Sequence, residues 1–290
     1  METFHYPAKL LLFGEYSVII GGRALAMPFP HFSGRWSKKS PPTDPRITAF
    51  FKYLEQQKSL KSTLDVQQMK ADVASGIAFE SSIPLGYGLG SSGALCAATY
   101  KAYATKKSTD FHVLKAQLAE MEAHFHGTSS GTDPLICYLQ KTLLLEGDKI
   151  ELLDDLTLNQ RSDLQFFLLD VGFPRPHSDL INWFMAQIKN NDYRRQVEAI
   201  LLPSVENMIS ALIQSQPLLL FDFMHEISHF QSRYFQPMIP ESIQSLWMQG
   251  LSSDWFKLKL CGAGGGGFFL GMTKDFEQLK TITDFRLIAT

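Results

Sequence analysis

Two glycine-rich segments constrain this chain more than any other feature of its sequence. The first, PLGYGLGSSG, occupies residues 84–93, and the second, GAGGGG, occupies residues 262–267. Ordering four consecutive glycines is entropically costly, so a fold rarely uses them for a simple turn. Glycine lets a backbone approach a ligand closely and lets successive N–H groups point into one concavity, so both segments are typical of phosphate-binding loops.

The first segment lies between a predicted strand and a predicted helix. Residues 73–83 end in an alternation of apolar and polar side chains, and residues 94–107 are rich in alanine, without Gly or Pro. A helix N-terminus carries partial positive charge, so this junction favours phosphate binding. Ser91 and Ser92 add hydroxyl groups that can bind a phosphate oxygen or Mg²⁺.

The glycine pattern alone leaves other nucleotide folds open. The G-x-G-x-x-G sequence of dinucleotide-binding folds occurs in both segments, which shows how readily it arises. A Rossmann fold expects the motif in its first strand–helix unit, with an acidic residue roughly 20 positions later. Asp110 lies near that distance, but the motif follows two or three predicted elements. An NAD-dependent enzyme is therefore a less favoured alternative, and no Walker-type G-x-x-x-x-G-K-[ST] sequence occurs.

Composition excludes several classes of protein. Of the 290 residues, 45% are hydrophobic and 19% are charged, and the net charge of −2 predicts no general affinity for nucleic acid or anionic membranes. The three cysteines are far apart in the sequence and form no C-x-x-C pair, which argues against disulfides and a Cys-type zinc site. We find no signal peptide and no membrane span, and expect a cytoplasmic protein.

The length suggests two domains, and the polar segment at residues 148–165 predicts a boundary between domains 1–155 and 156–290. In the first domain, the patterns predict a strand–turn–strand unit, a loop and two helices, at residues 6–30, 33–45, 46–60 and 111–125. In the second, they predict a buried strand and four helices, at residues 166–173, 178–189, 193–213, 218–235 and 241–249. A further apolar strand begins at Phe268.

A possible zinc motif appears in the second domain. His225 to His229 spell H-E-x-x-H on a predicted helix, where two histidines share one face and Glu226 would act as a base. A catalytic zinc needs a third protein ligand, and the extension that supplies one in metzincins is absent. We therefore expect two helix histidines in or near the core.

Four ionisable or hydroxyl side chains form a set that suits phosphoryl transfer. Taken singly, Lys9 could be a strand end, Asp133 a turn residue before proline, and Glu122 a solvated helix carboxylate. Phosphoryl transfer from ATP requires a base for the acceptor, a cation near the transferring oxygens, and oxygen ligands for Mg²⁺. Asp133, Lys9, and the pair Glu122 and Ser92 would supply these groups.

Three segments resemble the three signature motifs of the GHMP kinases. They are PAKLLLFGEYSVIIGGRALAMPF, PLGYGLGSSGA and KLCGAGGGGFFL, in the expected order and spacing over residues 7–271. The resemblance implies an α+β fold, with an N-terminal domain like ribosomal S5 domain 2 and a C-terminal ferredoxin-like domain. It also implies an enzyme that uses ATP and Mg²⁺ to phosphorylate a small hydroxylated molecule.

The mevalonate kinase branch fits best, on FGEYSVIIGGRALAMP and EAHFHGTSSGTD, which makes mevalonate the expected acceptor. The alternatives are phosphomevalonate kinase, another sugar or homoserine-type kinase of the superfamily, and a catalytically inactive nucleotide-binding homologue. ATP consumption across a panel of acceptors distinguishes them.

Carried over position by position, the resemblance assigns a role to each matching residue. Asp133 becomes the catalytic base and Lys9 its cationic partner, while Ser92 and Glu122 become the Mg²⁺ ligands. The residues implied to contact the ATP phosphates are Gly86, Gly88, Leu89, Gly90, Ser91, Ser92, Gly93, Gly264 and Gly265. Those implied to contact the substrate are Glu15, Tyr16, Gly131 and Arg175.

Three departures from the family pattern fall where the acceptor would bind. Tyr16 replaces the usual His of the first motif, Gly93 interrupts the usual S-S-A-A, and in residues 170–179 Gly172 and Arg175 fit, whereas His177 and Ser178 are displaced. These departures leave the acceptor open. Phosphomevalonate would need basic partners, for which the candidates are Arg23, Arg35, Arg175 and His177. The sequence does not indicate the oligomeric state, and a homodimer is left open.

Overall fold

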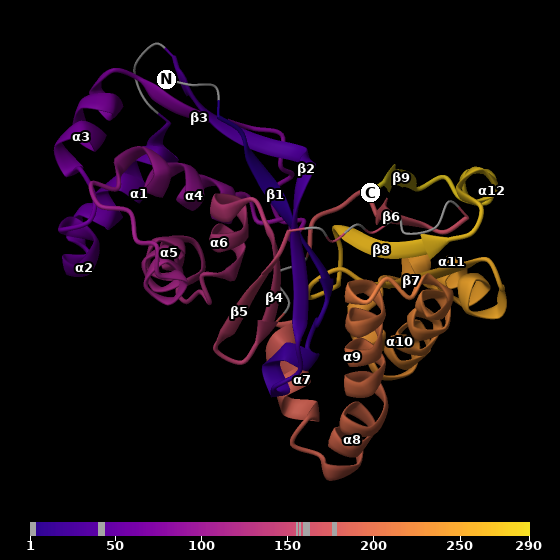
Figure 1. Cartoon of the computed structure of the whole chain (residues 1–290). Coiled ribbons are helices and arrows are strands. Elements are labelled where there is room, and N and C mark those ends of the chain that lie inside the picture. Colours follow the sequence, from indigo (N-terminus) through magenta and orange to yellow (C-terminus); the bar gives the residue numbers. More distant parts are fainter. Residues whose placement is uncertain (1–3, 40–43, 155, 157, 159–162, 176–178) are drawn as a thin grey trace. The chain divides into compact units, whose positions relative to one another are not determined.

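The computed structural model describes residues 4–39, 44–154, 156, 158, 163–175 and 179–290 (Figure 1). Contacts group the chain into two compact units. The first unit comprises Met1–Leu10, Met27–Pro84 and Leu89–Lys141, and the second comprises Leu11–Ala26, Leu85–Gly88 and Thr142–Thr290. These units are defined by contacts, whereas the domain boundary at residues 155 and 156 comes from the sequence, and that boundary stays a prediction.

Two long strands, β1 (Tyr6–Phe13) and β2 (Ala24–Lys38), contribute residues to both units. In the first unit, the end of β2 pairs antiparallel with β3 (Ile77–Ser81). The prediction of a loop at residues 33–45 is therefore wrong for residues 33–38. These polar residues form a strand because Trp36 packs against aromatic rings from other elements, namely Phe51, Phe79 and Tyr103.

Six helices complete the first unit: α1 (Pro45–Gln56), α2 (Lys58–Lys61), α3 (Val66–Ala74), α4 (Ser91–Tyr103), α5 (Phe111–His126) and α6 (Thr132–Leu139). The predicted helices at residues 46–60 and 111–125 are confirmed, although a break at Gln57 divides the first of them. The alanine-rich α4 packs against both α5 and α6, because its buried side chains are mostly small. Figure 1 shows these three helices together.

The second unit contains a hairpin that the sequence analysis did not predict. Strands β4 (Thr142–Glu146) and β5 (Lys149–Leu153) pair antiparallel across a turn in which Gly147 has a φ of 56°. Residues 143–145 of β4 also pair with the first residues of β2, and the strand order of the sheet is β1-β2-β4-β5, with β3 paired to β2. Part of the predicted linker at residues 148–165 is therefore β5.

The second sheet confirms the predicted ferredoxin-like half. Its strands are β6 (Gln165–Asp170), β7 (Phe256–Leu260), β8 (Phe268–Thr273) and β9 (Arg286–Ala289). Neighbouring strands are antiparallel and lie in the order β7-β8-β6-β9, with α12 (Phe276–Thr281) between β8 and β9 in the chain. A strand, a helical region, a hairpin, a helix and a last strand in this order form the ferredoxin-like arrangement.

The helices of the second unit are α7 (Leu180–Gln187), α8 (Asn191–Gln196), α9 (Leu202–Ile213), α10 (Leu220–Tyr234) and α11 (Glu241–Ser252). Short turns of helix are η1 (Ser17–Ile20), η2 (Val197–Leu201), η3 (Pro217–Leu219) and η4 (Gln236–Met238). The four predicted helices are confirmed to within a few residues. Helices α10 and α11 pack against β7 and cover the apolar sheet.

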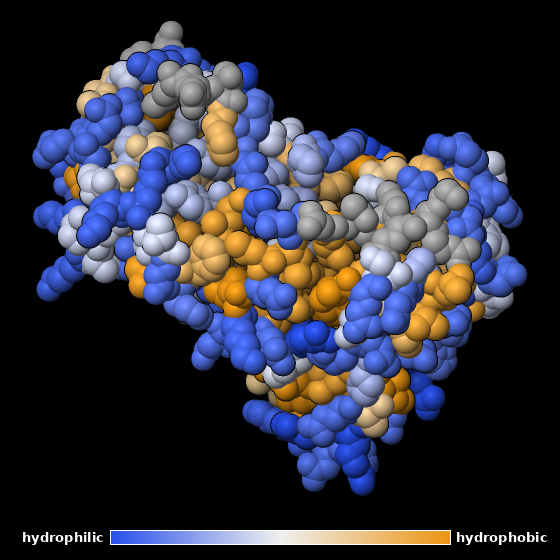
Figure 2. Space-filling model, viewed as in Figure 1, coloured by the Kyte–Doolittle hydropathy of each residue, from blue (hydrophilic) through white to orange (hydrophobic). Residues whose placement is uncertain are grey.

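One continuous helical stretch, Asn191–Ile213, is long and apolar enough to cross a membrane by length and composition. Within its most apolar window, 44% is buried inside the structure, and core helices of soluble proteins pass the same test. Figure 2 shows hydrophilic side chains at the α8 end of this stretch, where Arg194 and Arg195 are exposed. The stretch is therefore weak evidence for a membrane span.

Candidate active site

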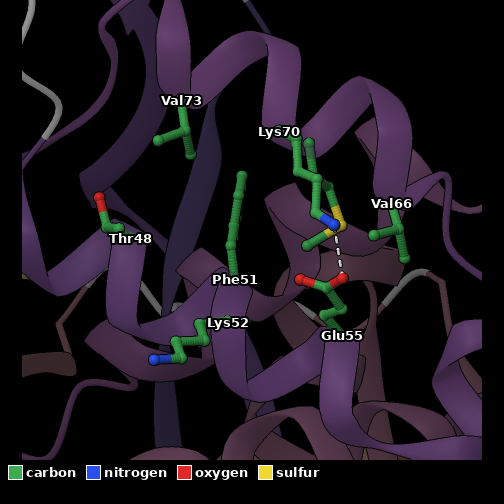
Figure 3. Close-up of a pocket in the computed structure, with 8 residues that line it drawn as sticks. Thr48, Phe51, Lys52, Glu55, Val66, Lys70 and Val73 are labelled. Carbon is green, nitrogen blue, oxygen red and sulfur yellow. Dashed lines mark hydrogen bonds and ion pairs between the residues drawn. The ribbon is translucent and has the colours of Figure 1, made fainter.

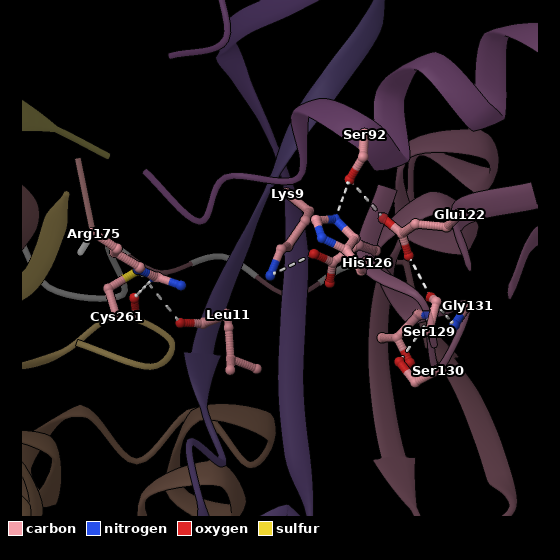
Figure 4. Close-up of polar contacts among 12 residues, drawn as sticks. Lys9, Leu11, Ser92, Glu122, His126, Ser129, Ser130, Gly131, Arg175 and Cys261 are labelled. Carbon is pink, nitrogen blue, oxygen red and sulfur yellow. Dashed lines mark hydrogen bonds and ion pairs between the residues drawn. The ribbon is translucent and has the colours of Figure 1, made fainter. Parts of the chain in front are cut away.

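The structure brings together the lysine and the aspartate that the sequence analysis paired. Lys9 lies on β1 with only 8% of its surface exposed, and its Nζ atom is 2.9 Å from Oδ2 of Asp133. The backbone N–H of Lys9 also donates to the carbonyl of Leu89, at 2.9 Å. The strand therefore holds Lys9, which Figure 4 labels, beside both the carboxylate of Asp133 and the first glycine loop.

Asp133 lies in the first turn of α6, where its local sequence suggested a turn. Gly131 precedes the helix with a φ of 73°, which is accessible to glycine at little cost, and Pro134 is tolerated so close to a helix start. The first turn of a helix carries partial positive charge, so it stabilises a carboxylate at this position. The site thus has a fixed anion at the start of a helix.

Two glycines let α4 approach this ion pair. A Cβ atom on Gly90, which has a φ of 73°, would lie 2.8 Å from Cγ of Lys9. A Cβ atom on Gly93 would lie 2.9 Å from the backbone carbon of Asp133, so the departure at Gly93 allows the first turns of α4 and α6 to meet. The N–H groups of residues 91–93 begin α4 and have no acceptor within the helix, so they can donate to a ligand.

A buried carboxylate lies next to the start of α4. Glu122, on α5, has 5% of its surface exposed, and its two oxygens accept hydrogen bonds from Ser92 at 2.9 Å and from Ser129 at 2.5 Å. Burial raises the pKa of Glu122, and the negative charge of Asp133 raises it further. Ser92 and Glu122, predicted as partners in metal binding, are thus in direct contact (Figure 4).

Two residues of this cluster were not predicted from the sequence. Nε2 of His126 is 3.0 Å from the hydroxyl of Ser92, and the hydroxyl of Ser129 accepts a hydrogen bond from the N–H of Gly131, at 2.9 Å. His126 follows Glu122 by four residues on α5, and this spacing indicates that the two share a helix face. No comparable pattern pointed to Ser129, which lies in an irregular segment.

The oxygen atoms of this cluster suit a magnesium ion held together with phosphates. Mg²⁺ prefers oxygen ligands and is usually bound by one or two carboxylates, substrate phosphates and water. Ser92 and Glu122 supply such oxygens side by side. Among the described residues, no group of three or more His, Cys, Asp or Glu side chains could hold a metal by itself. The two oxygen donors fit a magnesium ion whose other ligands are phosphates and water.

In the second unit, Arg175 lies against both glycine-rich segments. Its backbone N–H donates to the carbonyl of Gly86 at 3.0 Å, and its guanidinium donates to the carbonyl of Cys261. A Cβ atom on Gly88 would lie 2.1 Å from Nη2 of Arg175, and one on Gly262 would lie 2.5 Å from it. These glycines make room for a guanidinium group, a reason for their presence that the sequence analysis missed.

The glycines of the third motif also have contacts within the second unit. The N–H of Gly265 donates to the carbonyl of Met238 at 2.7 Å, and a Cβ atom on Gly264 would lie 2.7 Å from the same oxygen. A Cβ atom on Gly267 would lie 2.8 Å from the carbonyl oxygen of Tyr87. Close backbone packing accounts for these glycines, and contact between Gly264 or Gly265 and a phosphate stays a prediction.

Glu15 and Tyr16, predicted to contact the substrate, are buried in the second unit. Glu15 forms an ion pair with Lys259, whose side chain is fully buried, and burial raises the pKa of Glu15. The hydroxyl of Tyr16 donates to the carbonyl of Ala263 at 2.6 Å, and its ring contacts Phe184 and Phe235. Both side chains thus make contacts within the protein, and their substrate role stays a prediction.

The remaining basic candidates have acidic partners or lie outside the described residues. The backbone and side chain of Arg23 donate to the carboxylate of Glu206 on α9, and Nη2 of Arg23 donates to Ser210 at 2.8 Å. Arg35 pairs with Glu80 on the neighbouring strand, at 3.3 Å. The altered positions His177 and Ser178 lie outside the described residues.

The H-E-x-x-H sequence lies on α10, as expected. The rings of His225 and His229 stack with centroids 6.2 Å apart, and the carboxylate of Glu226 accepts a hydrogen bond from Ser204 at 2.8 Å. His225 is half-buried, whereas His229 is exposed and so lies outside the core. No third ligand completes a zinc site within the described residues. The three cysteines are buried.

A separate cavity of about 180 Å³ opens between α1 and α3 in the first unit (Figure 3). Phe51, Val66 and Val73 line it, and Nζ of Lys70 is 2.5 Å from a carboxylate oxygen of Glu55. None of the residues assigned to phosphoryl transfer lines this cavity. The candidate active site is therefore the cluster around Lys9, not this cavity.

Comparison with known proteins agrees with this geometry. Residues 47–141 match the family described as the GHMP kinases N terminal domain. Over this segment the chain is similar to the GHMP kinases. Over 158 residues the chain is 29% identical to the mevalonate kinase of Pyrococcus abyssi. The aligned segment makes up 45% of this chain and 47% of that protein. The alignment thus spans about half the length of this curated relative.

Solved structures of GHMP kinases share the fold of the whole chain. The mevalonate kinase of Methanococcus jannaschii has a TM-score of 0.62 at 16% identity, covering 99% of this chain and 96% of that one. The galactokinase of Lactococcus lactis has a TM-score of 0.67 at 12% identity, covering 99% and 92%. The phosphomevalonate kinase of Streptococcus pneumoniae has a TM-score of 0.65 at 15% identity, covering 97% and 94%. These similar scores show the GHMP kinase fold and do not distinguish the acceptors.

Proposed function

We propose that this chain is a cytoplasmic small-molecule kinase that transfers the γ-phosphoryl group of ATP to a hydroxyl group, with mevalonate as the favoured acceptor. The observation that carries the proposal is the Lys9–Asp133 ion pair beside Gly90, at the start of α4. An ammonium, a carboxylate and free helix N–H groups in one place are what phosphoryl transfer requires.

Each residue of the cluster has a task in this reaction. The carboxylate of Asp133 accepts the proton of the acceptor hydroxyl, and Lys9 holds that carboxylate in place and presents positive charge to the transferring oxygens. The N–H groups that begin α4 hold phosphate oxygens, and Ser92 and Glu122 hold Mg²⁺. Bound Mg²⁺·ATP supplies the phosphoryl group and neutralises part of its charge. Catalysis then rests on position and electrostatics.

Two observations favour mevalonate over phosphomevalonate. The phosphate group of phosphomevalonate would need basic side chains that are free to bind it, but Arg23 forms an ion pair with Glu206 and Arg35 forms one with Glu80. The curated relative that aligns with this chain is a mevalonate kinase. A catalytically inactive nucleotide-binding protein is less favoured, because the base and its cationic partner are both present and in contact.

An acceptor screen tests the proposal. With ATP and Mg²⁺, we expect ATP consumption with mevalonate and little with phosphomevalonate, homoserine or galactose, measured by coupled ADP release. ATP consumption with phosphomevalonate alone would show that the chain is a phosphomevalonate kinase instead. ATP binding without turnover on any acceptor would favour the inactive homologue, and binding of NADH without ATP would overturn the kinase proposal.

Removing the proposed metal ligands should raise the Mg²⁺ requirement. We expect Ser92→Ala and Glu122→Gln each to raise the Mg²⁺ concentration for half-maximal activity by at least about 10-fold, since even outer-shell partners are worth roughly 10–100-fold in metal affinity. Titration of activity with Mg²⁺ at fixed ATP measures the change. Glu120→Gln is the matched control, because Glu120 lies on the same helix and contacts Ser59 instead. An unchanged titration in both variants would contradict the metal assignment.

A further inference from the structure

Five groups of the first unit form one chain of hydrogen bonds around Glu122. Its oxygens accept from Ser92 and from Ser129, Ser92 also contacts His126, and Ser129 also accepts from the N–H of Gly131. Figure 4 shows dashed lines that link these residues one after another. The metal-binding carboxylate is thus connected to the residue that precedes α6, the helix that carries Asp133.

The number of protons on the two serine hydroxyls sets which group donates in the hydrogen bonds to Glu122. A serine hydroxyl has one proton to donate. Because the hydroxyl of Ser129 accepts from Gly131, its own proton is available for Glu122. Ser92 likewise donates to the other carboxylate oxygen, and Nε2 of His126 lies 3.0 Å from the same hydroxyl. Both serine hydroxyls therefore donate to the carboxylate.

We propose that Ser129 is a positioning residue for the metal site: it fixes the orientation of the Glu122 carboxylate and ties it to Gly131, the residue that precedes α6. This inference rests on the proposed kinase function. Ser92 has a second task as a cation ligand, whereas Ser129 contacts the carboxylate and a backbone N–H. A group that holds a ligand's other oxygen selects which oxygen faces the metal.

The burial of Glu122 explains why such support is needed. An ionised carboxylate that is almost fully buried is costly unless hydrogen-bond donors compensate the lost water. Ser129 and Ser92 supply this compensation, each through a hydrogen bond to one carboxylate oxygen. The same two bonds leave the carboxylate one orientation. Ser129 therefore acts through Glu122 and is not itself a catalytic residue.

The test compares Ser129→Ala with Ser129→Thr, which retains a hydroxyl. We expect Ser129→Ala to weaken Mn²⁺ binding in the presence of ATP by about 10-fold, measured by electron paramagnetic resonance, and to leave metal-free ATP binding unchanged. Ser129→Thr should restore most of the Mn²⁺ affinity. In the ligand-free protein, the Gly131 amide should exchange its hydrogen faster in Ser129→Ala, because its acceptor is gone.

Ser130→Ala is the matched control. The hydroxyl of Ser130 accepts a hydrogen bond from the N–H of Thr132, at 3.3 Å, so its loss should leave Mn²⁺ binding unchanged. Wild-type Mn²⁺ affinity in Ser129→Ala, or an equal loss in Ser130→Ala, would overturn the positioning role while leaving the kinase proposal intact. A wild-type protein that binds neither ATP nor Mn²⁺ would overturn both. Thermal unfolding of each variant shows whether a loss reflects misfolding.

Discussion

An Asp133→Asn variant is expected to lose turnover by roughly 10²–10⁴-fold, the usual contribution of a positioned base, while it binds ATP as the wild-type protein does. Asparagine has nearly the same shape, but it cannot accept the proton of the acceptor hydroxyl. The loss should appear in kcat, because Asp133 acts on the reacting hydroxyl and not on the nucleotide. Steady-state kinetics with mevalonate, together with calorimetric titration of ATP, measure the two effects separately.

Asp110→Asn is the matched control for this experiment. Asp110 caps the start of α5 by accepting hydrogen bonds from the N–H groups of His112 and Val113, and asparagine caps helices about equally well. Its kcat should therefore equal that of the wild type. If Asp133→Asn kept full turnover, Asp133 would not be the base, and the ion pair with Lys9 would be structural.

Replacing Lys259 with methionine is expected to lower the free energy of unfolding by about 3–5 kcal/mol, the usual result of removing one partner of a buried ion pair. The Lys259 ammonium contacts the Glu15 carboxylate and donates to the carbonyl of Leu12, at 2.7 Å. Methionine would fill the volume but leave Glu15 buried without a counter-charge. Urea denaturation followed by circular dichroism measures the loss.

Lys257→Met is the matched control, since it changes the same residue type on the same strand. Lys257 is also buried, but its ammonium donates to the carbonyls of Gly250 and Ser253, which carry no full charge. Burial lowers the pKa of Lys257, so its charge already carries a cost, and its removal should destabilise the protein less. An equal loss in both variants would show that Glu15 needs no counter-charge.

The loss in Lys259→Met should also depend on pH. Burial raises the pKa of Glu15 even beside Lys259, and removal of the lysine should raise it further. A carboxyl whose pKa is higher in the folded state than in the unfolded state binds protons on folding, so stability falls as pH rises through the folded pKa. We expect Lys259→Met to be more stable near pH 5 than near pH 8. The double variant with Glu15→Gln should lose this dependence.

Features encoded by neighbouring residues were predictable from the sequence. The helices at residues 111–125 and 241–249 were predicted because apolar periodicity is a local property of a helix. The glycine loop at residues 84–93 was predicted because its glycines lie between a predicted strand and a predicted helix, and Gly88 and Gly90 have positive φ in the structure. Resemblance to a family then paired Lys9 with Asp133.

Features that depend on distant partners were not predictable. The polar residues 33–38 form a strand because Trp36 meets rings from three other elements, and Ser129 lies in a segment without periodicity. The guanidinium of Arg175, predicted to contact a substrate, occupies space that exists because Gly88 and Gly262 have no side chains. The contacts of Trp36 and Arg175 join residues far apart in the sequence, whereas Ser129 contacts Glu122, only seven residues away, from a segment without a regular pattern.

The sequence by itself determined the glycine loops, the α+β pattern and the residues that we propose for phosphoryl transfer. The tertiary structure alone decided which charges are buried. The alternation of FKLKL in β7 would place Lys257 and Lys259 in solvent, yet both are buried. Helices α10 and α11 pack against this strand, and Lys259 pairs with Glu15, which lies near the other end of the sequence. Burial of a charge depends on its partner, and no local pattern contains that partner.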